Sequence, residues 1–144
     1  MLSRALLVLG ITVCCAACVS PPIYESGGSG LPLCGSLPNC VNSLSGQGGQ
    51  AIEPLIASQQ QWRDLVRFVE KEKDWLVQLQ HENFIQVMVV SRLMRFRDDL
   101  QLLYYPTLNV VHVRSSSRIG IGDMGANRKR VELLRHLLQE SGGG

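Results

Sequence analysis

The sequence predicts an α+β domain: a four-stranded antiparallel sheet with two helices packed on one face, preceded by an N-terminal disulfide loop. Three observations support this prediction. The chain has 144 residues, which suits one domain. Apolar residues recur at helical spacing in two segments, one near the middle and one near the end of the chain. A β-prone region lies between these segments, so the element order is helix, strands, helix.

The first helix is expected over residues 58–73. Ser58 is a suitable N-cap, because its hydroxyl can accept a free backbone N–H of the first turn. Trp62, Leu65, Val66 and Val69 recur at 3.6-residue spacing, with charged side chains largely opposite. This stripe predicts packing against a sheet rather than an aromatic cofactor site.

Four strands are expected between the helices, over residues 75–80, 84–91, 95–105 and 108–114. Their short connections favour antiparallel neighbours. Residues 51–56 predict a short extended segment, which Pro54 restricts to a sheet edge. The second helix is expected over residues 127–140, with Val131, Leu134 and Leu138 as its inner stripe. Both helices on one face would leave the other face more exposed, or partly covered by the cysteine loop.

The first residues of the chain predict an export signal. A short segment with one positive charge precedes an uncharged apolar stretch, residues 5–12, that is too short to span a bilayer. Ala16 and Ala17 then precede Cys18, an arrangement that resembles the lipobox of bacterial lipoproteins, although Cys15 stands where leucine is usual. We therefore expect a lipoprotein signal peptide over residues 1–17 and lipidation of Cys18, with acyl groups such as palmitate.

Two alternatives to the lipoprotein stay open: a plain secretory signal cut near Ala17, and an uncleaved anchor. All three place the domain outside the cytoplasm. Residues 18–30 would form a flexible tether, residues 31–140 a single domain and residues 141–144 a disordered tail. The lipobox resemblance implies a membrane-anchored protein of the cell envelope on the periplasmic side. The outer membrane is favoured in a Gram-negative host, since Val19 and Ser20 lack the aspartate typical of inner-membrane retention.

Charge and cysteine content restrict the partners. The formal net charge is +2 and Arg4 belongs to the signal, so the domain lacks the basic balance of a nucleic-acid-binding protein. Cys34 and Cys40 predict one disulfide in an exported protein. No metal and no cofactor are expected, because the three histidines show no ligand spacing. The expected partners are the membrane, through the lipid anchor, and an envelope protein or an anionic small ligand.

The segment 113–132, VRSSSRIGIGDMGANRKRVE, holds the candidate site. Guanidinium groups and the free N–H groups at a helix N-terminus both favour an anion there. The candidate ligand-binding residues are Arg114, Ser115, Ser117, Arg118, Asp123, Asn127, Arg128 and Arg130. Cations are unfavourable at a helix N-terminus, which implies counter-anions: Asp98, Asp99 and Asp123, or a bound ligand. An internal Arg–Asp network, an anionic-ligand site and a solvated run of charges all remain open, and Asn127 is expected to cap the helix.

Known catalytic motifs do not fit this segment. Gly120, Gly122 and Gly125 form a literal GxGxxG, but a dinucleotide fold needs a further parallel strand, and the glycines more simply permit tight turns. Asp98 and Asp99 are adjacent on a strand and point to opposite faces, so they cannot share a proton; we expect ion pairs, with Arg95 and Arg97 nearby.

The three consecutive serines also lack a catalytic setting. Residues 115–117 have no GxSxG elbow around them and no base within evident reach. His112 is near in sequence but would lie along the preceding strand. A polar turn, whose hydroxyls satisfy loop backbone groups, is therefore the simpler interpretation.

Three motifs together resemble domain-of-unknown-function family 1499. They are Cys34-x-x-x-Pro38-Asn39-Cys40-Val41, then Phe96-x-Asp98-Asp99, then Arg114-Ser-x-Ser117-Arg118-x-Gly120-x-x-Asp123-x-Gly125-x-Asn127-Arg128-x-Arg130-Val131-Glu132. Leu37 stands where the family usually has serine, and Ile121 where it usually has an aromatic residue. The resemblance covers about residues 31–140. It implies an exported or lipid-anchored protein of an uncharacterised family and supplies no reaction.

Together these observations favour a non-enzymatic envelope lipoprotein, a binding or interaction module whose Arg/Asp/Ser loop holds an anionic group. The alternative is an enzyme of unknown class that uses Asp98 or Asp99 with Arg114 and Arg118. That alternative requires those side chains to converge in an open pocket.

Overall fold

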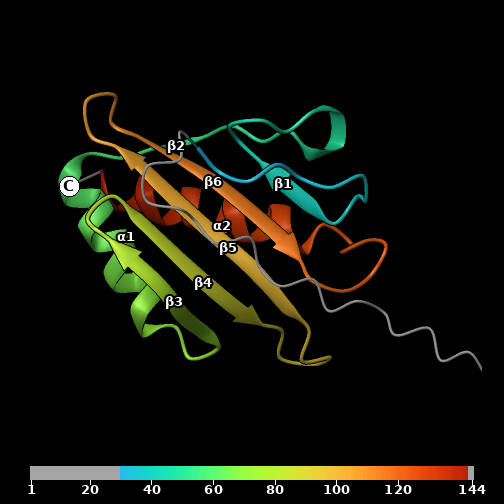
Figure 1. The fold of residues 1–144 in the computed structure, drawn as a ribbon. Coiled ribbons are helices and arrows are strands. Elements are labelled where there is room, and N and C mark those ends of the chain that lie inside the picture. The colour runs from blue at the N-terminus through green and yellow to red at the C-terminus, as the bar shows by residue number, and fades with distance from the viewer. Residues whose placement is uncertain (1–29, 143–144) are drawn as a thin grey trace, which may run out of the picture.

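The computed structural model describes residues 30–142 (Figure 1). The expected signal peptide, Cys18 and nearly all of the expected tether lie outside the described residues, as do Gly143 and Gly144. The elements in chain order are β1 (Cys40–Asn42), the short 3-10 helix η1 (Gly48–Gln50), β2 (Leu55–Ile56), α1 (Gln59–Lys71), β3 (Trp75–His81), β4 (Phe84–Val90), β5 (Arg97–Tyr105), β6 (Val110–Ser117) and α2 (Ala126–Ser141).

The strands form one six-stranded antiparallel sheet in the order β1-β6-β5-β4-β3, and β2 also pairs with β6. The four predicted strands are present as β3 to β6, so the α+β class is confirmed, but the predicted number of strands is wrong. The two further strands, β1 and β2, are three and two residues long, and β2 lies within the short extended segment expected over residues 51–56. Strands this short cannot show alternation, and turn-forming residues surround both.

Both helices pack on the same face of the sheet, as predicted (Figure 1). α1 begins after Ser58, whose side chain forms a capping box with Gln61. The apolar stripes of the two helices meet alternate side chains of the strands in one core. Its members include Trp62, Leu65 and Val69 of α1, Val131, Leu134 and Leu138 of α2, and Ile85, Val87, Leu100, Leu102, Val111 and Val113 of the sheet.

The opposite face of the sheet carries a buried polar row. Gln86, Gln101 and Arg114 are in register across β4, β5 and β6, and each is 6% exposed or less. Next to this row, Leu31 packs against Phe84 and Leu103. The segment before β1 therefore covers part of this face, in agreement with the expectation from the sequence.

Two boundaries differ from the prediction. β6 continues to Ser117, so the three serines belong to a strand, and their interpretation as a polar turn is wrong. β6 is extended because Ser116 and Ser117 pair with Asp99 and Asp98 of β5. Polar residues can form a strand when the neighbouring strand supplies backbone hydrogen bonds. α2 runs to Ser141, one residue into the expected tail.

Within residues 30–142, each helix is too short or too polar to cross a bilayer.

Candidate functional site

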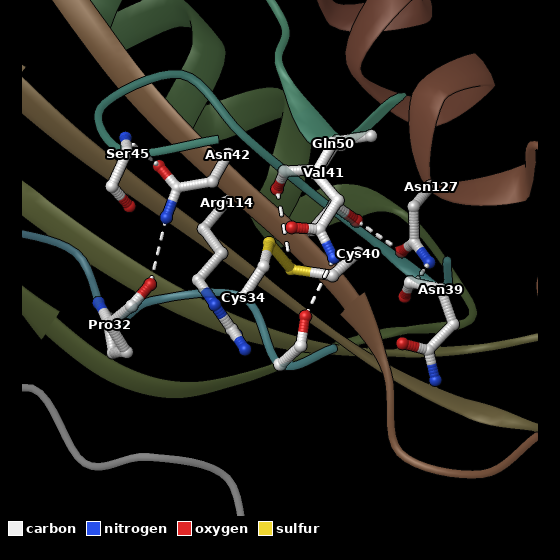
Figure 2. The surroundings of a disulfide bond; sticks show 12 residues. Pro32, Cys34, Asn39, Cys40, Val41, Asn42, Ser45, Gln50, Arg114 and Asn127 are labelled. Atoms are coloured by element: carbon white, nitrogen blue, oxygen red, sulfur yellow. Dashed lines mark hydrogen bonds between the residues drawn. A yellow bond between two sulfur atoms is a disulfide. The ribbon is translucent and has the colours of Figure 1, made fainter. Parts of the chain in front are cut away.

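The predicted disulfide between Cys34 and Cys40 is present, with a Cα–Cα distance of 5.8 Å (Figure 2). Cys40 opens β1 and is paired with Ser116 of β6. The preceding residue, Asn39, is thereby held beside the end of β6, where its carbonyl accepts the backbone N–H of Ser117 at 2.9 Å. The disulfide loop is thus attached to the end of the strand from which the candidate segment continues.

Asn127 is the hydrogen-bonding centre of the site. Its side chain is fully buried. The amide nitrogen donates to the carbonyl of Asn39 (2.9 Å), to Ser117 Oγ (3.0 Å) and to Asp123 Oδ2 (2.7 Å). The amide oxygen accepts from Ser115 Oγ, at 2.7 Å. One side chain therefore connects the disulfide loop, the end of β6 and the loop that leads to α2.

Asp98 and Arg130 form a buried ion pair on the helix-covered face. Arg130 Nη2 donates to Asp98 Oδ2 at 2.6 Å, and Nη1 donates to Ser115 Oγ and to Asn127 Oδ1 at 2.6 and 2.7 Å. The side chain of Arg130 is 10% exposed and that of Asp98 is 6% exposed. Asn127 and Arg130 are three residues apart on α2 and so lie on one face of the helix, toward the sheet.

Asp99 pairs with Arg118 instead. Arg118 Nε and Nη2 both donate to the Asp99 carboxylate, with the shortest contact 2.6 Å, and Nη2 also donates to Gln78. Asp99 is in register with Ser116 and lies on the face opposite the helices. The predicted separation of the two carboxylates is confirmed. The expected arginine neighbours are wrong: Arg95 lies 3.7 Å from Asp74, and Arg97 is exposed.

The carboxylate of Asp123 accepts free backbone N–H groups at the N-terminus of α2. These are the N–H groups of Gly125 and Asn127, both at 2.9 Å. Gly125 has φ +76° and precedes the first helical residue, so the prediction that Asn127 caps the helix is wrong. Burial raises the pKa of Asp123, but the hydrogen bonds from Asn127 and Gly125 outweigh burial and leave the pKa below its usual value. The negative charge also suits the helix dipole.

Arg128 is the third arginine engaged by the protein itself. Its Nη2 donates to the carbonyl oxygens of Gly49 and Ala51, at 3.0 and 2.7 Å. A cleft of about 390 Å³ lies beside it, between the disulfide loop, η1 and the start of α2. The cleft is lined by Pro38, Gln50, Asp123, Gly125 and Arg128, among others, and not by Asp98 or Asp99.

Arg114 differs from the other arginines of the segment. Its side chain is 6% exposed and, among residues 30–142, makes one hydrogen bond, from Nη1 to Gln101 Oε1 at 3.3 Å. Its Nε is buried and has no hydrogen-bond partner within this described part of the chain. Burial lowers the pKa of Arg114, and the charge of Asp99 offsets this only in part. Figure 2 shows the Arg114 side chain on the side of the sheet where Pro32 and Cys34 lie.

The structure thus brings six of the eight predicted candidates together around the start of α2 and the helix-covered side of β6, whereas Arg118, bonded to Asp99, and Arg114 lie on the opposite face. Sequence reasoning missed the contribution of Asn39 as a candidate, and that of the row of glutamines that connects Arg114 to Arg118 through hydrogen bonds: Gln101, Gln86 and Gln78. Asn39 could have been found, because it lies inside the Pro38-Asn39-Cys40 motif. The glutamines carry no local signal, since only strand register places them beside an arginine.

We expect Arg130→Gln to lower the free energy of unfolding by about 3–5 kcal/mol, because it leaves the Asp98 carboxylate buried without a counter-ion. Asp98→Asn in the same chain should recover part of this loss, whereas Asp99→Asn should not. Urea denaturation of the singles and doubles gives the coupling energies. Lys129→Gln, which removes an exposed cation one residue away, is the control; equal losses for both substitutions would contradict the assignment of the pair.

Because the pKa of Asp123 is lowered in the folded protein, we expect its contribution to the free energy of unfolding to depend on pH. A pKa lowered by folding contributes stability that is present above the unfolded pKa and is lost as the pH falls through the folded value. The difference in unfolding free energy between the wild type and Asp123→Asn should therefore be constant above about pH 5 and shrink below about pH 4. Thermal or urea unfolding across this range measures it. A difference that grows toward acid would show that Asp123 has the opposite role.

The motif residues of the three sequence segments meet at one end of the sheet: Asn39, then Asp98 and Asp99, then the segment from Arg114 to Arg130. Neither a curated protein nor a solved structure matches the chain significantly. A family model does match, over residues 30–138, which is most of the chain and essentially all of the described domain. The chain belongs to the family described as "Protein of unknown function (DUF1499)".

Proposed function

We propose that the protein is an exported binding module of the cell envelope, anchored to the membrane by lipid on Cys18, and that it binds an anionic group without catalysing a reaction. The export signal and the lipobox-like sequence support the location. The separation of the two carboxylates supports a binding role. Asp98 and Asp99 are each 4% exposed or less, each is occupied by an arginine, and they lie on opposite faces of the sheet.

Among the arginines of the candidate segment 113–132, Arg114 has the most unused hydrogen-bonding capacity. Arg118 and Arg130 are neutralised by carboxylates, and Arg128 is held by two carbonyl oxygens. Arg114 has five N–H donors and a single hydrogen bond, to a neutral amide. Burial of a guanidinium without a counter-ion costs several kcal/mol, and buried donors are ordinarily satisfied. The unpartnered Nε of Arg114 is the observation that carries the proposal.

A small carboxylate or phosphate group suits this position. Two acceptor oxygens can meet a guanidinium with two parallel hydrogen bonds, which is the strongest pairing that arginine makes. Gln101 and Asn42 lie beside Arg114 in register, and Asn42 Nδ2 donates to the carbonyl of Pro32 at 2.9 Å.

We expect inorganic phosphate or succinate to raise the melting temperature of the wild type, because a ligand that binds only the folded state stabilises it. Arg114→Met should abolish this shift. It should also raise the unfolding free energy of the ligand-free protein, since it replaces an uncompensated buried charge with an apolar side chain of similar length. Thermal unfolding with and without each anion measures both effects.

The control is Arg128→Gln, which removes an arginine that the protein already engages and should preserve the shift. If neither anion shifts the wild type, or if Arg114→Met destabilises the free protein while the anion effect persists, Arg114 has a structural role and the proposed anion site is wrong.

The anchor has a separate test. Globomycin, which blocks the lipoprotein signal peptidase, should cause the unprocessed chain to accumulate, and Cys18→Ala should prevent lipid labelling. Processing is followed by gel mobility and by incorporation of labelled palmitate. Unchanged processing in globomycin, together with cleavage of the Cys18→Ala chain at its usual position, would indicate plain secretion.

A further inference from the structure

Two loops at one end of the sheet expose large apolar side chains. The hairpin between β4 and β5 presents Leu93, Met94 and Phe96, which are 90%, 62% and 46% exposed. The loop between β6 and α2 presents Ile119, Ile121 and Met124, which are 53%, 77% and 97% exposed. Single exposed apolar residues are normal on a protein surface, whereas six in two loops indicate an interaction surface.

The two loops emerge from neighbouring strands. Arg118 at the start of the second loop donates its backbone N–H to the carbonyl of Arg97, at the end of the first, at 3.1 Å. Figure 1 shows both loops at the same end of the sheet, away from the turn between β5 and β6. The exposed side chains therefore project from one end of the domain.

Both loops are shaped by hydrogen bonds. In the hairpin, Ser91 donates its N–H to the carbonyl of Phe96 at 2.8 Å, and Ser91 Oγ accepts the N–H of Phe96 at 2.9 Å. In the second loop, Asn39 Nδ2 donates to the carbonyl of Gly120 at 2.8 Å. The apolar side chains are consequently held at protruding positions by a fixed backbone, and they are not covered by folding of the loop onto the domain.

Charge at this end is positive around the apolar tips. The hairpin carries Arg92, Arg95 and Arg97, all exposed. One carboxylate, that of Asp74, lies near two of these arginines, 3.4 Å from Arg92 and 3.7 Å from Arg95. The carboxylate of Asp123 in the second loop is occupied by backbone N–H groups of the α2 terminus. Among the described residues the three arginines share this one carboxylate, so the hairpin combines apolar tips with a net positive charge.

We propose that this end of the domain, the loops 91–97 and 118–125, docks onto the surface of an anionic phospholipid bilayer. Protruding apolar tips enter a fluid apolar medium without a complementary pocket, and flanking arginines contact anionic headgroups while their stems remain in the interface. Each cation near such a surface adds to the attraction, and this part is weakened by salt. The docking surface is separate from the Arg114 position and does not depend on a lipid anchor.

The test uses the chain from Val19 to Gly144, which contains every residue of the two core clusters and lacks Cys18, so that no acyl chain contributes. We expect it to sediment with vesicles of phosphatidylglycerol and phosphatidylcholine, to bind pure phosphatidylcholine more weakly, and to release as salt increases. Leu93→Ser and Ile121→Ser should each lower the partition coefficient about tenfold or more, the factor that corresponds to removal of one buried aliphatic side chain. Arg97→Gln should weaken binding to the anionic vesicles alone.

Leu108→Ser is the matched control. Leu108 is 66% exposed in the turn between β5 and β6, at the opposite end of the sheet, and its substitution should leave vesicle binding unchanged. As a second measurement, tryptophan emission of Leu93→Trp should shift to the blue on addition of the anionic vesicles, while that of Leu108→Trp should not. Both readouts are independent of Arg114, and Arg114→Met should bind vesicles like the wild type.

The proposal is overturned if the wild-type chain does not bind the anionic vesicles, or if Leu93→Ser and Ile121→Ser bind as well as Leu108→Ser. The wild-type chain could instead fail to bind vesicles and form a dimer in sedimentation that Ile121→Ser abolishes. That result would show that these loops form an interface between two copies of the chain.

Discussion

The buried amide of Asn127 is the interaction on which the candidate site depends. It joins the start of α2 to the disulfide loop, 88 residues earlier in the sequence, and to the end of β6. The same amide oxygen accepts from Arg130, so the ion pair with Asp98 is oriented by Asn127 as well as by charge. Hydrogen bonds that share donors and acceptors in this way reinforce one another in a low-dielectric interior.

The fold could be predicted where periodicity is long. α1 and the strands β3 to β5 each present enough residues for a helical or alternating pattern, and their order alone implies a sheet with helices on one face. The sequence does not predict β1, and it predicts β2 only as part of a short extended segment, because the strand character of both comes from pairing with β6. The extension of β6 through the serines has the same cause: tertiary pairing overrides a local preference for turns.

The sequence predicts which residues form the site better than it predicts which residues bond to one another. The sequence locates the arginines, Asp123 and the two carboxylates, and strand alternation separates Asp98 from Asp99. The partners of those carboxylates come from α2 and from the loop before it, at separations that no local pattern encodes. Alternation also decides which face each arginine of the strand reaches, and only the three-dimensional structure shows that Arg118 on the polar face has a carboxylate partner whereas Arg114 bonds a neutral amide.

The disulfide between Cys34 and Cys40 makes the maturity of the domain depend on oxidation. Closure of so short a ring stabilises the folded state by about 2 kcal/mol, and it holds the Asn39 carbonyl where the Asn127 amide requires an acceptor. In a reducing compartment the two cysteines stay thiols. A chain in which they are thiols lacks this covalent restraint on Asn39 and is easier to unfold. Oxidation of one cysteine pair thereby stabilises both the fold and the hydrogen-bonding centre of the candidate site.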